Sequence, residues 1–203
     1  MKKEYKRSFL LNKEQFNKIL NGETSYLTID TLQGYLYPFN RLFEFTVNFN
    51  QFNNDKSNNF CNFSISVMNP DDPYERSLIT FNLTIERACS LFNECEYYLK
   101  KTKYILSSNS TQKELVKIND KYILNIFFKD KNEMMNYIPN FEFHEEVTLN
   151  KEYDEFNFAK VNIDGITENS ESDLSELNIF IKDEILREFD SNELSANFVT
   201  RTF

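Results

Sequence analysis

The chain has 203 residues, and its 32 Asp and Glu against 23 Lys and Arg give a formal net charge of −9. With 40% hydrophobic residues, among them 21 Phe and 11 Tyr, it can build a folded core, which excludes a disordered chain. Three glycines and one histidine are too few for a glycine-rich phosphate loop or for a zinc site with several histidines.

The first predicted element is a helix over residues 12–21. Asn12 is a good N-cap, and Gln15 stands three residues later, which is the capping-box arrangement. Phe16 begins an apolar face, and Gly22 favours the end of the helix.

Three segments then alternate between apolar and polar residues, which is the pattern of strands with one buried face. They span residues 43–50, 63–67 and 79–85, and shorter strand-like segments precede them at 24–30 and 34–37. Because their connections are short and polar, we expect an antiparallel meander with its polar face in water.

The second half of the chain mixes helical and strand patterns. Residues 86–101 have a helical period, and so do residues 173–189 after a polar stretch. Strands are expected at 104–106, at 114–118 and 122–128 around an Asn119-Asp120 turn, and at 141–149, 156–163 and 196–203.

These elements predict an α+β fold with mainly antiparallel sheet. We expect about eight to ten strands and three helices, near residues 12–21, 86–101 and 173–189. Since no Pro/Gly/Ser-rich linker divides the chain, a single domain over residues 1–203 is predicted, with a split near residue 86 or 132 as the alternative.

No segment of the sequence is apolar enough for a membrane helix, which needs roughly 18 apolar residues. The apolar stretch behind the basic N-terminus, Phe9–Leu11, is too short for a signal peptide. Cys61, Cys89 and Cys95 are odd in number and show no C-x-x-C spacing, so reduced thiols are expected. We therefore expect a cytoplasmic protein without membrane contact.

No linear catalytic motif is present. The sequence has no Walker loop, dinucleotide fingerprint or G-x-S-x-G elbow. Asp71 and Asp72 lie between two prolines, and no acidic-x-Lys tripeptide of the metal-dependent nuclease pattern follows, so we interpret the pair as a turn. We expect a protein that is not an enzyme and binds neither metal nor cofactor. A metal-dependent enzyme that uses carboxylates stays the alternative.

Charge is distributed unevenly along the chain. Residues 140–193 hold 16 acidic and four basic side chains, a net charge of −12, whereas the rest of the chain has a net charge of +3. Spaced carboxylates can complement a basic groove, so we predict a non-enzymatic binding protein whose partner is a protein with a basic surface. A face that only keeps the protein in solution is the other interpretation. The predicted partner-binding residues are Glu142, Glu145, Glu146, Asp154, Glu155, Asp183 and Glu184.

Three further hypotheses follow from the charge map. If the partner's groove normally binds nucleic acid, the acidic region would be a nucleic-acid mimic that inhibits a host nuclease or defence complex, encoded by a phage or mobile element. Residues 97–131 are basic, and lysines beside aromatic rings are typical of single-strand binders, although the overall acidity opposes this. Self-association of the basic and acidic regions is the third. The candidate nucleic-acid-binding residues are Tyr97, Tyr98, Lys100, Lys101, Lys103 and Tyr104.

Overall fold

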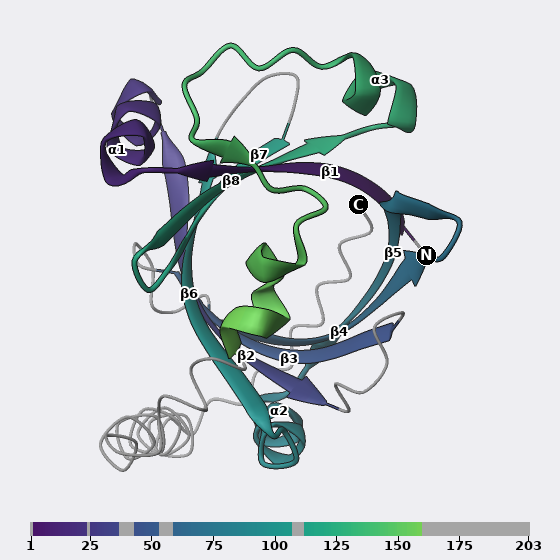
Figure 1. Cartoon of the computed structure of the whole chain (residues 1–203). Helices are drawn as coiled ribbons and strands as arrows, with labels where there is room; N and C mark the ends of the chain where they lie inside the picture. The colour runs from purple at the N-terminus through teal and green to yellow at the C-terminus, as the bar shows by residue number, and fades with distance from the viewer. Residues whose placement is uncertain (1, 24, 37–42, 53–58, 107–111, 160–203) are drawn as a thin grey trace. The chain divides into compact units, whose positions relative to one another are not determined.

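The structure is a computed structural model, and it describes residues 2–23, 25–36, 43–52, 59–106 and 112–159. Eight antiparallel strands form a closed barrel in the order β5-β4-β3-β2-β6-β7-β8-β1, because β1 pairs with β5 as well as with β8 (Figure 1). The strands are β1 (Lys2–Leu11), β2 (Tyr26–Leu36), β3 (Phe43–Phe52), β4 (Phe60–Asn69), β5 (Asp72–Leu83), β6 (Tyr97–Leu106), β7 (Gln112–Ile118) and β8 (Lys121–Phe128). A two-residue strand, β9 (Glu145–Glu146), pairs with β1.

Short helices connect the strands. They are α1 (Lys13–Gly22), α2 (Ile85–Phe92) and α3 (Lys131–Asn136), followed by the 3-10 helix η2 (Lys151–Tyr153) and a helical stretch at 155–159. Figure 1 shows α1, α2 and α3 outside the ring of strands, whereas η2 and the stretch after it lie within the ring. We call residues 151–159 the inner segment.

The outer core lies between one wall of the barrel and the helices α1 and α3. Phe9 of β1, Leu124 of β8 and Leu115 of β7 present their apolar sides outward, and Phe16 of α1 and Met134 of α3 cover them. The predicted helix at 12–21 is confirmed, and its capping box is formed by Asn12 and Gln15 at 2.8 and 2.9 Å. The N-cap sets the start of the helix that closes this wall.

Helix α2 packs against the outer face of β2 and β3 at Gly34. A Cβ atom at Gly34 would lie 2.7 Å from the Cys95 sulfur and 2.9 Å from the Phe92 ring. The Phe92 ring also meets Phe49 of β3 edge-on, at 5.2 Å between centroids. Glycine is required here because the ring and the sulfur fill the space of a side chain.

The polar face of the meander is inside the barrel, so the expectation that this face lies in water is wrong. Asn48 and Asn50 of β3 are buried, with 8% and 6% of their surface exposed, whereas Phe81 of β5 is 51% exposed on the outer face. The outward rings of Phe45, Phe63 and Phe81 are stacked across three strands. Alternation identifies two faces, but closure of the sheet decides which one is enclosed.

The helix predicted at 86–101 is wrong beyond Phe92, where α2 ends. Residues 97–106 form β6, which pairs with residues 26–35 of β2 along its whole length. The ladder of backbone hydrogen bonds outweighs a local helical period that placed Cys95 and Leu99 on one face. Leu99 instead points into the barrel beside Tyr35.

The strand pair predicted at 141–149 and 156–163 is also wrong for the described part of these ranges. Only Glu145–Glu146 is strand, and the chain turns into η2 three residues beyond Thr148. Asn150 caps η2, and the Asp154 carboxylate accepts a hydrogen bond from the Phe156 N–H at 3.2 Å. Two capping side chains this close together favour helical turns over an extended strand.

The predicted mainly antiparallel α+β fold is confirmed in its sheet content, and nine strands are present in the described residues. The Asn119-Asp120 turn is confirmed, with Asn119 in the left-handed region at φ 52°. The helix set differs: α3 was not predicted, and the helix at 173–189 lies outside the described residues. The single-domain prediction stays a prediction for the same reason. In the part of the chain that is described, no helix combines the length and apolarity needed to cross a membrane.

Candidate functional site

Charged side chains from several strands point into the barrel. On β6, Lys101 and Lys103 share the face of Leu99, which belongs to an apolar cluster inside the barrel. On β1, Lys6 shares the face of Ser8, whose hydroxyl donates a hydrogen bond to Asn125 of β8 at 2.8 Å. These lysines therefore face a common interior, although β1 and β6 lie far apart in the sequence.

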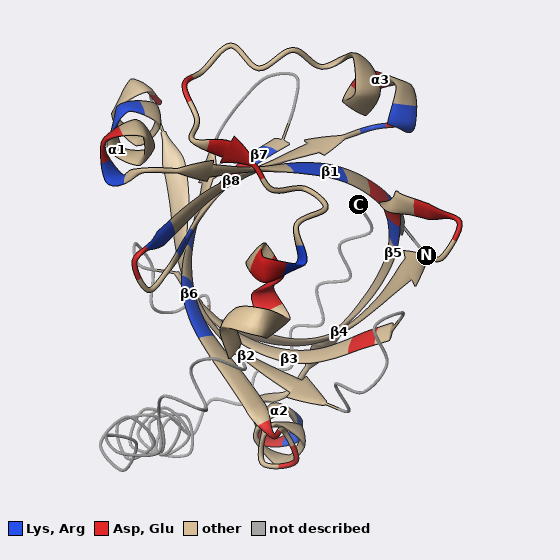
Figure 2. Ribbon diagram, viewed as in Figure 1, with Lys and Arg blue, Asp and Glu red and all other residues tan. Residues whose placement is uncertain are grey.

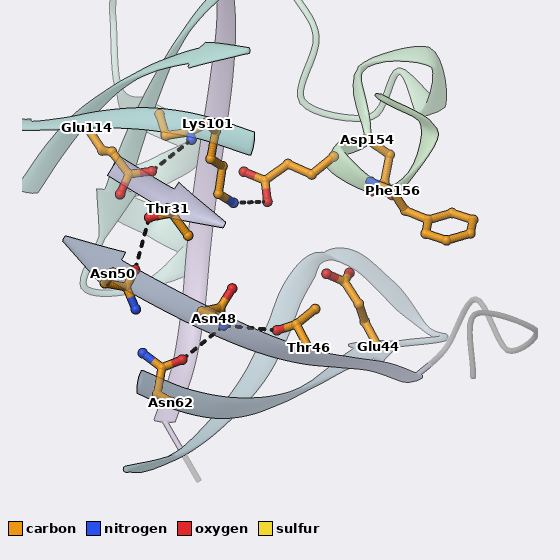
Figure 3. A network of polar contacts seen from close by, with 12 residues as sticks. Thr31, Glu44, Thr46, Asn48, Asn50, Asn62, Lys101, Glu114, Asp154 and Phe156 are labelled. Carbon is orange, nitrogen blue, oxygen red and sulfur yellow. Dashed lines mark hydrogen bonds and ion pairs between the residues drawn. The ribbon is translucent and has the colours of Figure 1, made fainter. Parts of the chain in front are cut away.

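Lys101 is the most enclosed of these cations and is paired with Glu155 of the inner segment. Only 3% of the Lys101 side chain is exposed, and its ammonium contacts the Glu155 carboxylate. Figure 3 shows Lys101 pointing toward the segment that carries Asp154 and Phe156. Burial alone would raise the pKa of Glu155, but the charges of Lys101, Lys103 and Lys6 outweigh it and lower this pKa to about 2. Burial lowers the pKa of Lys101, and the Glu155 charge opposes that shift.

Two further carboxylates lie on the inner wall. Glu44 of β3 is 3.7 Å from the Arg76 guanidinium of β5, and burial raises the Glu44 pKa while Arg76 opposes the shift. Glu114 of β7 accepts a hydrogen bond from the Asn125 amide at 3.3 Å. The interior thus carries side chains of both charge signs, with Glu44 beside Arg76 and Glu114 on the strand next to β6.

A ladder of neutral polar side chains lines β2, β3 and β4 (Figure 3). The Thr31 hydroxyl donates to the side-chain oxygen (Oδ1) of Asn50 at 2.9 Å. The side-chain amide (Nδ2) of Asn48 donates to the side-chain oxygen (Oδ1) of Asn62, also at 2.9 Å. The side-chain oxygen (Oδ1) of Asn48 and the Tyr35 hydroxyl are buried without a hydrogen-bond partner. Burial raises the pKa of Tyr35 well above its usual range, and Glu44 and Glu155 add to the shift, so the hydroxyl keeps its proton. A neutral donor and a free acceptor therefore face the interior.

The inner segment covers the apolar part of the interior. The Phe156 ring meets Tyr35 and Tyr97 edge-on, at 5.2 and 5.4 Å between centroids. Ala159 is fully buried in the cluster that includes Val116 of β7. The segment is thus held by ring contacts on one side and by the ion pair with Lys101 on the other.

The carboxylates do not form a complete metal site by themselves. Within the described ranges, no group of three or more His, Cys, Asp or Glu side chains is placed to hold a metal ion. Asp71 lies in a turn, as predicted, and its N–H donates to the side-chain oxygen of Asn69 at 3.0 Å, whereas Asp72 is the first residue of β5 and pairs with Lys131. A metal in this protein would need ligands from elsewhere, such as oxygens of a bound substrate.

The predicted acidic binding residues lie in different environments. Glu142 is exposed and 3.4 Å from Lys18, Glu145 is exposed on β9, and Glu146 forms a bidentate contact with Arg7 at 2.5 and 2.8 Å. Asp154 and Glu155 belong to the inner segment, and Glu155 faces the interior. Asp183 and Glu184 lie outside the described residues. Partner binding by these residues stays a prediction.

The predicted nucleic-acid residues alternate between the two faces of β6. Tyr97, Lys101 and Lys103 point inward. Tyr98 packs on Phe92 of α2, and the remaining outward residues are Lys100, which is exposed, and Tyr104, which packs on Phe16 of α1. The structure thus divides the predicted stacking surface between the interior and the outer helices.

The distribution of charge follows the barrel rather than the sequence. In Figure 2, acidic positions of the inner segment appear within the ring of strands, and basic positions of β6 and β1 surround them. Lys6, Glu44, Arg76 and Glu114 were missed as site residues because each comes from a different strand and none belongs to a linear motif. Their only sequence signal is a charge on the polar phase of an alternating segment, as for Glu44.

Known proteins resemble this chain in fold only. No family model matches the sequence, and no curated protein matches it. The PH1819 protein from Pyrococcus horikoshii is similar at 16% identity and a TM-score of 0.52, over 65% of this chain and 82% of that one. The PH1012 protein from the same organism has 17% identity and a TM-score of 0.51, over the same shares. The inorganic triphosphatase NE1496 has 18% identity and a TM-score of 0.49, over 78% of this chain and 95% of that one.

The expectation that the protein is not an enzyme is wrong. It was based on missing linear motifs, but a closed barrel brings charged side chains together from separate strands and needs no short motif. The scarcity of glycine and histidine therefore excludes only loop-based and histidine-based chemistry.

Proposed function

We propose that the protein binds a compound with linked phosphate groups inside the barrel and hydrolyses it. The observation that carries the proposal is the convergence of Lys101, Lys103 and Lys6 on one carboxylate, Glu155. Three ammonium groups from two strands define a position for an anion, and the position is enclosed, so an anion there is attracted more strongly than in water.

The rest of the wall suits a phosphate chain. Arg76 adds a planar guanidinium that can bind two phosphate oxygens at once. The Tyr35 hydroxyl is buried without a partner and is a donor for a further oxygen. The position that these groups surround has neutral and cationic donors in excess, which matches a ligand that has only acceptor oxygens.

The carboxylates on the inner wall are candidate ligands for a divalent cation that binds together with the phosphate compound. Mg²⁺ is commonly bound by one or two carboxylates together with substrate phosphates and waters. Glu44 and Glu114 are the candidates, since each lies on the inner wall. This arrangement agrees with the lack of a complete metal site among the described residues.

The reaction is the addition of water to a terminal phosphorus. The bond from that phosphorus to the bridging oxygen breaks, the shortened phosphate chain leaves with the electron pair, and a proton of the water is released. Lys101 and Lys103 would stabilise the charge on the oxygens as the bond breaks. The name of one similar structure, inorganic triphosphatase, suggests inorganic triphosphate as the first substrate to test.

The test is phosphate release from inorganic triphosphate with Mg²⁺, measured for the full chain and two lysine variants. Lys103→Met removes an inward ammonium, and Lys100→Met removes an outward one from the same strand. We expect Lys103→Met to lower kcat/KM at least about tenfold, because the lost charge acts on the transition state, whereas Lys100→Met keeps the wild-type value. Equal activities of the two variants, or a wild-type chain that neither binds nor hydrolyses triphosphate, would overturn the proposal.

A further inference from the structure

We propose that the inner segment is an internal competitor of the ligand. The Glu155 carboxylate holds the position beside Lys101 that a phosphate group of the ligand would take, so the ligand binds by displacing Glu155. This inference rests on the proposed function and adds a regulation to that site.

Glu155 has the properties of a stand-in for a phosphate oxygen. It is an anion in contact with the ammonium of Lys101, which has 3% of its side chain exposed, and Lys103 and Lys6 act on the same carboxylate. A ligand phosphate cannot occupy this position at the same time, since two anions beside one enclosed ammonium would repel each other.

The inner segment can leave the barrel wall without disrupting the sheet. Its backbone hydrogen bonds are local: the Asp154 N–H donates to the Lys151 carbonyl at 3.1 Å, and the Asn157 N–H donates to the Asp154 carbonyl at 2.9 Å. The contacts to the wall come from side chains: the Glu155 carboxylate, the Phe156 ring, and the apolar side chains of Tyr153, Phe158 and Ala159. Release therefore breaks no strand pairing of the barrel.

The exchange is selective for anions because Lys101 is enclosed. An ammonium left there without a counter-charge is costly, so loss of Glu155 from its position is unfavourable until another anion replaces it. A phosphate group satisfies this condition, whereas a neutral ligand does not. Only molecules in which Glu155 has left the position can bind a phosphate compound. The apparent dissociation constant is therefore the intrinsic one divided by the fraction of such molecules.

The test is the affinity for inorganic triphosphate without divalent metal, measured by titration calorimetry on the full chain. Glu155→Gln removes the competing charge and keeps the shape of the side chain. Glu152→Gln is the matched control, because Glu152 is exposed in the same segment. We expect Glu155→Gln to bind triphosphate at least about tenfold more tightly than wild type, and Glu152→Gln to bind as wild type does.

A second variant keeps every charge and loosens the segment. Phe156→Ala removes the ring contacts with Tyr35 and Tyr97, so it also favours release and should tighten triphosphate binding. In wild type, amide hydrogen exchange of residues 153–158 should rise when triphosphate binds. This variant and this measurement decide the question even where Glu155→Gln fails to fold.

The outcomes separate the two proposals. Binding of triphosphate with equal affinity by wild type, Glu155→Gln and Phe156→Ala would overturn the competition and leave the proposed function standing. The same holds if exchange of residues 153–158 does not change on binding. No binding by any of the folded proteins would overturn the proposed function, and the competition with it.

Discussion

Lys101 and Glu155 are 54 positions apart in the sequence and form an ion pair inside the barrel. The lysine comes from a barrel strand that pairs with β2 and β7, and the glutamate comes from the inner segment that follows the barrel. This contact joins two parts of the chain that no backbone ladder connects. Its contribution to the stability of the protein can be tested by substitution and by changing the pH.

Removal of the cation alone should destabilise the protein strongly. Lys101→Met leaves the Glu155 carboxylate in the interior without its main partner, which we expect to lower the free energy of unfolding by about 3 kcal/mol. The double variant Lys101→Met, Glu155→Gln should regain most of this loss, because no lone charge remains. Urea denaturation measures both, with Lys100→Met as the exposed control. A Lys101→Met variant as stable as Lys100→Met would contradict the role of the pair.

The stability contributed by Glu155 should depend on pH. Its pKa in the folded protein, about 2, lies below the ordinary value of 4.5, so the folded state favours the ionised form. The contribution is complete above the ordinary pKa and is lost as the pH falls through the folded pKa. The difference in unfolding free energy between wild type and Glu155→Gln should therefore be large at about pH 6 and clearly smaller at about pH 3. Denaturant titrations at both values check this, and a constant difference would rule it out.

Gly34 should be intolerant of a side chain. Gly34→Ala places a Cβ 2.7 Å from the Cys95 sulfur and 2.9 Å from the Phe92 ring, so α2 must shift from the sheet. We expect a loss of about 1–3 kcal/mol and a lower Tm. Gly22→Ala is the matched control, since no atom lies within 4 Å of the added Cβ there, and its Tm should stay the same or rise. If both variants melted at the same temperature, the tight packing at Gly34 would be refuted.

Glu146 and Glu145 are neighbours in β9 with different roles. Glu146 accepts two hydrogen bonds from Arg7 at 2.5 and 2.8 Å, and Arg7 also donates to the Tyr137 carbonyl at 2.7 Å. Glu146→Gln should therefore cost about 1 kcal/mol, between an exposed and a buried ion pair. Glu145→Gln should be neutral because Glu145, although exposed like Glu146, makes no ion pair with the described residues. Thermal melts of the two single variants measure the difference, and a reversed order would contradict it.

Some features of the fold could be predicted because they depend on neighbouring residues. The capping box of Asn12 and Gln15 set the start of α1, and the left-handed Asn119 gave the turn between β7 and β8. The alternation of residues 43–50 identified a strand, since successive side chains of a strand point to opposite faces. These local rules do not require knowledge of the rest of the chain.

Other features could not be predicted because they depend on partners far away in the sequence. Leu99 and Lys101 share the inner face of β6, and this mixed face hides the alternation that would have separated a strand from a helix. Asp154 and Asn150 turned an expected strand into helical turns inside the barrel. In both cases long-range pairing or enclosure outweighed the local pattern.

The sequence by itself determined the scarcity of glycine and histidine, the uneven charge and the alternating strands. Only the tertiary structure decided where the charges act. Closure of the sheet enclosed the polar face, brought Lys6, Lys101 and Lys103 together, and placed Glu155 among them rather than on an acidic surface. The physical reason is that alternation fixes which side chains share a face, whereas enclosure, and with it the strength of their electrostatic interactions, depends on closing the barrel.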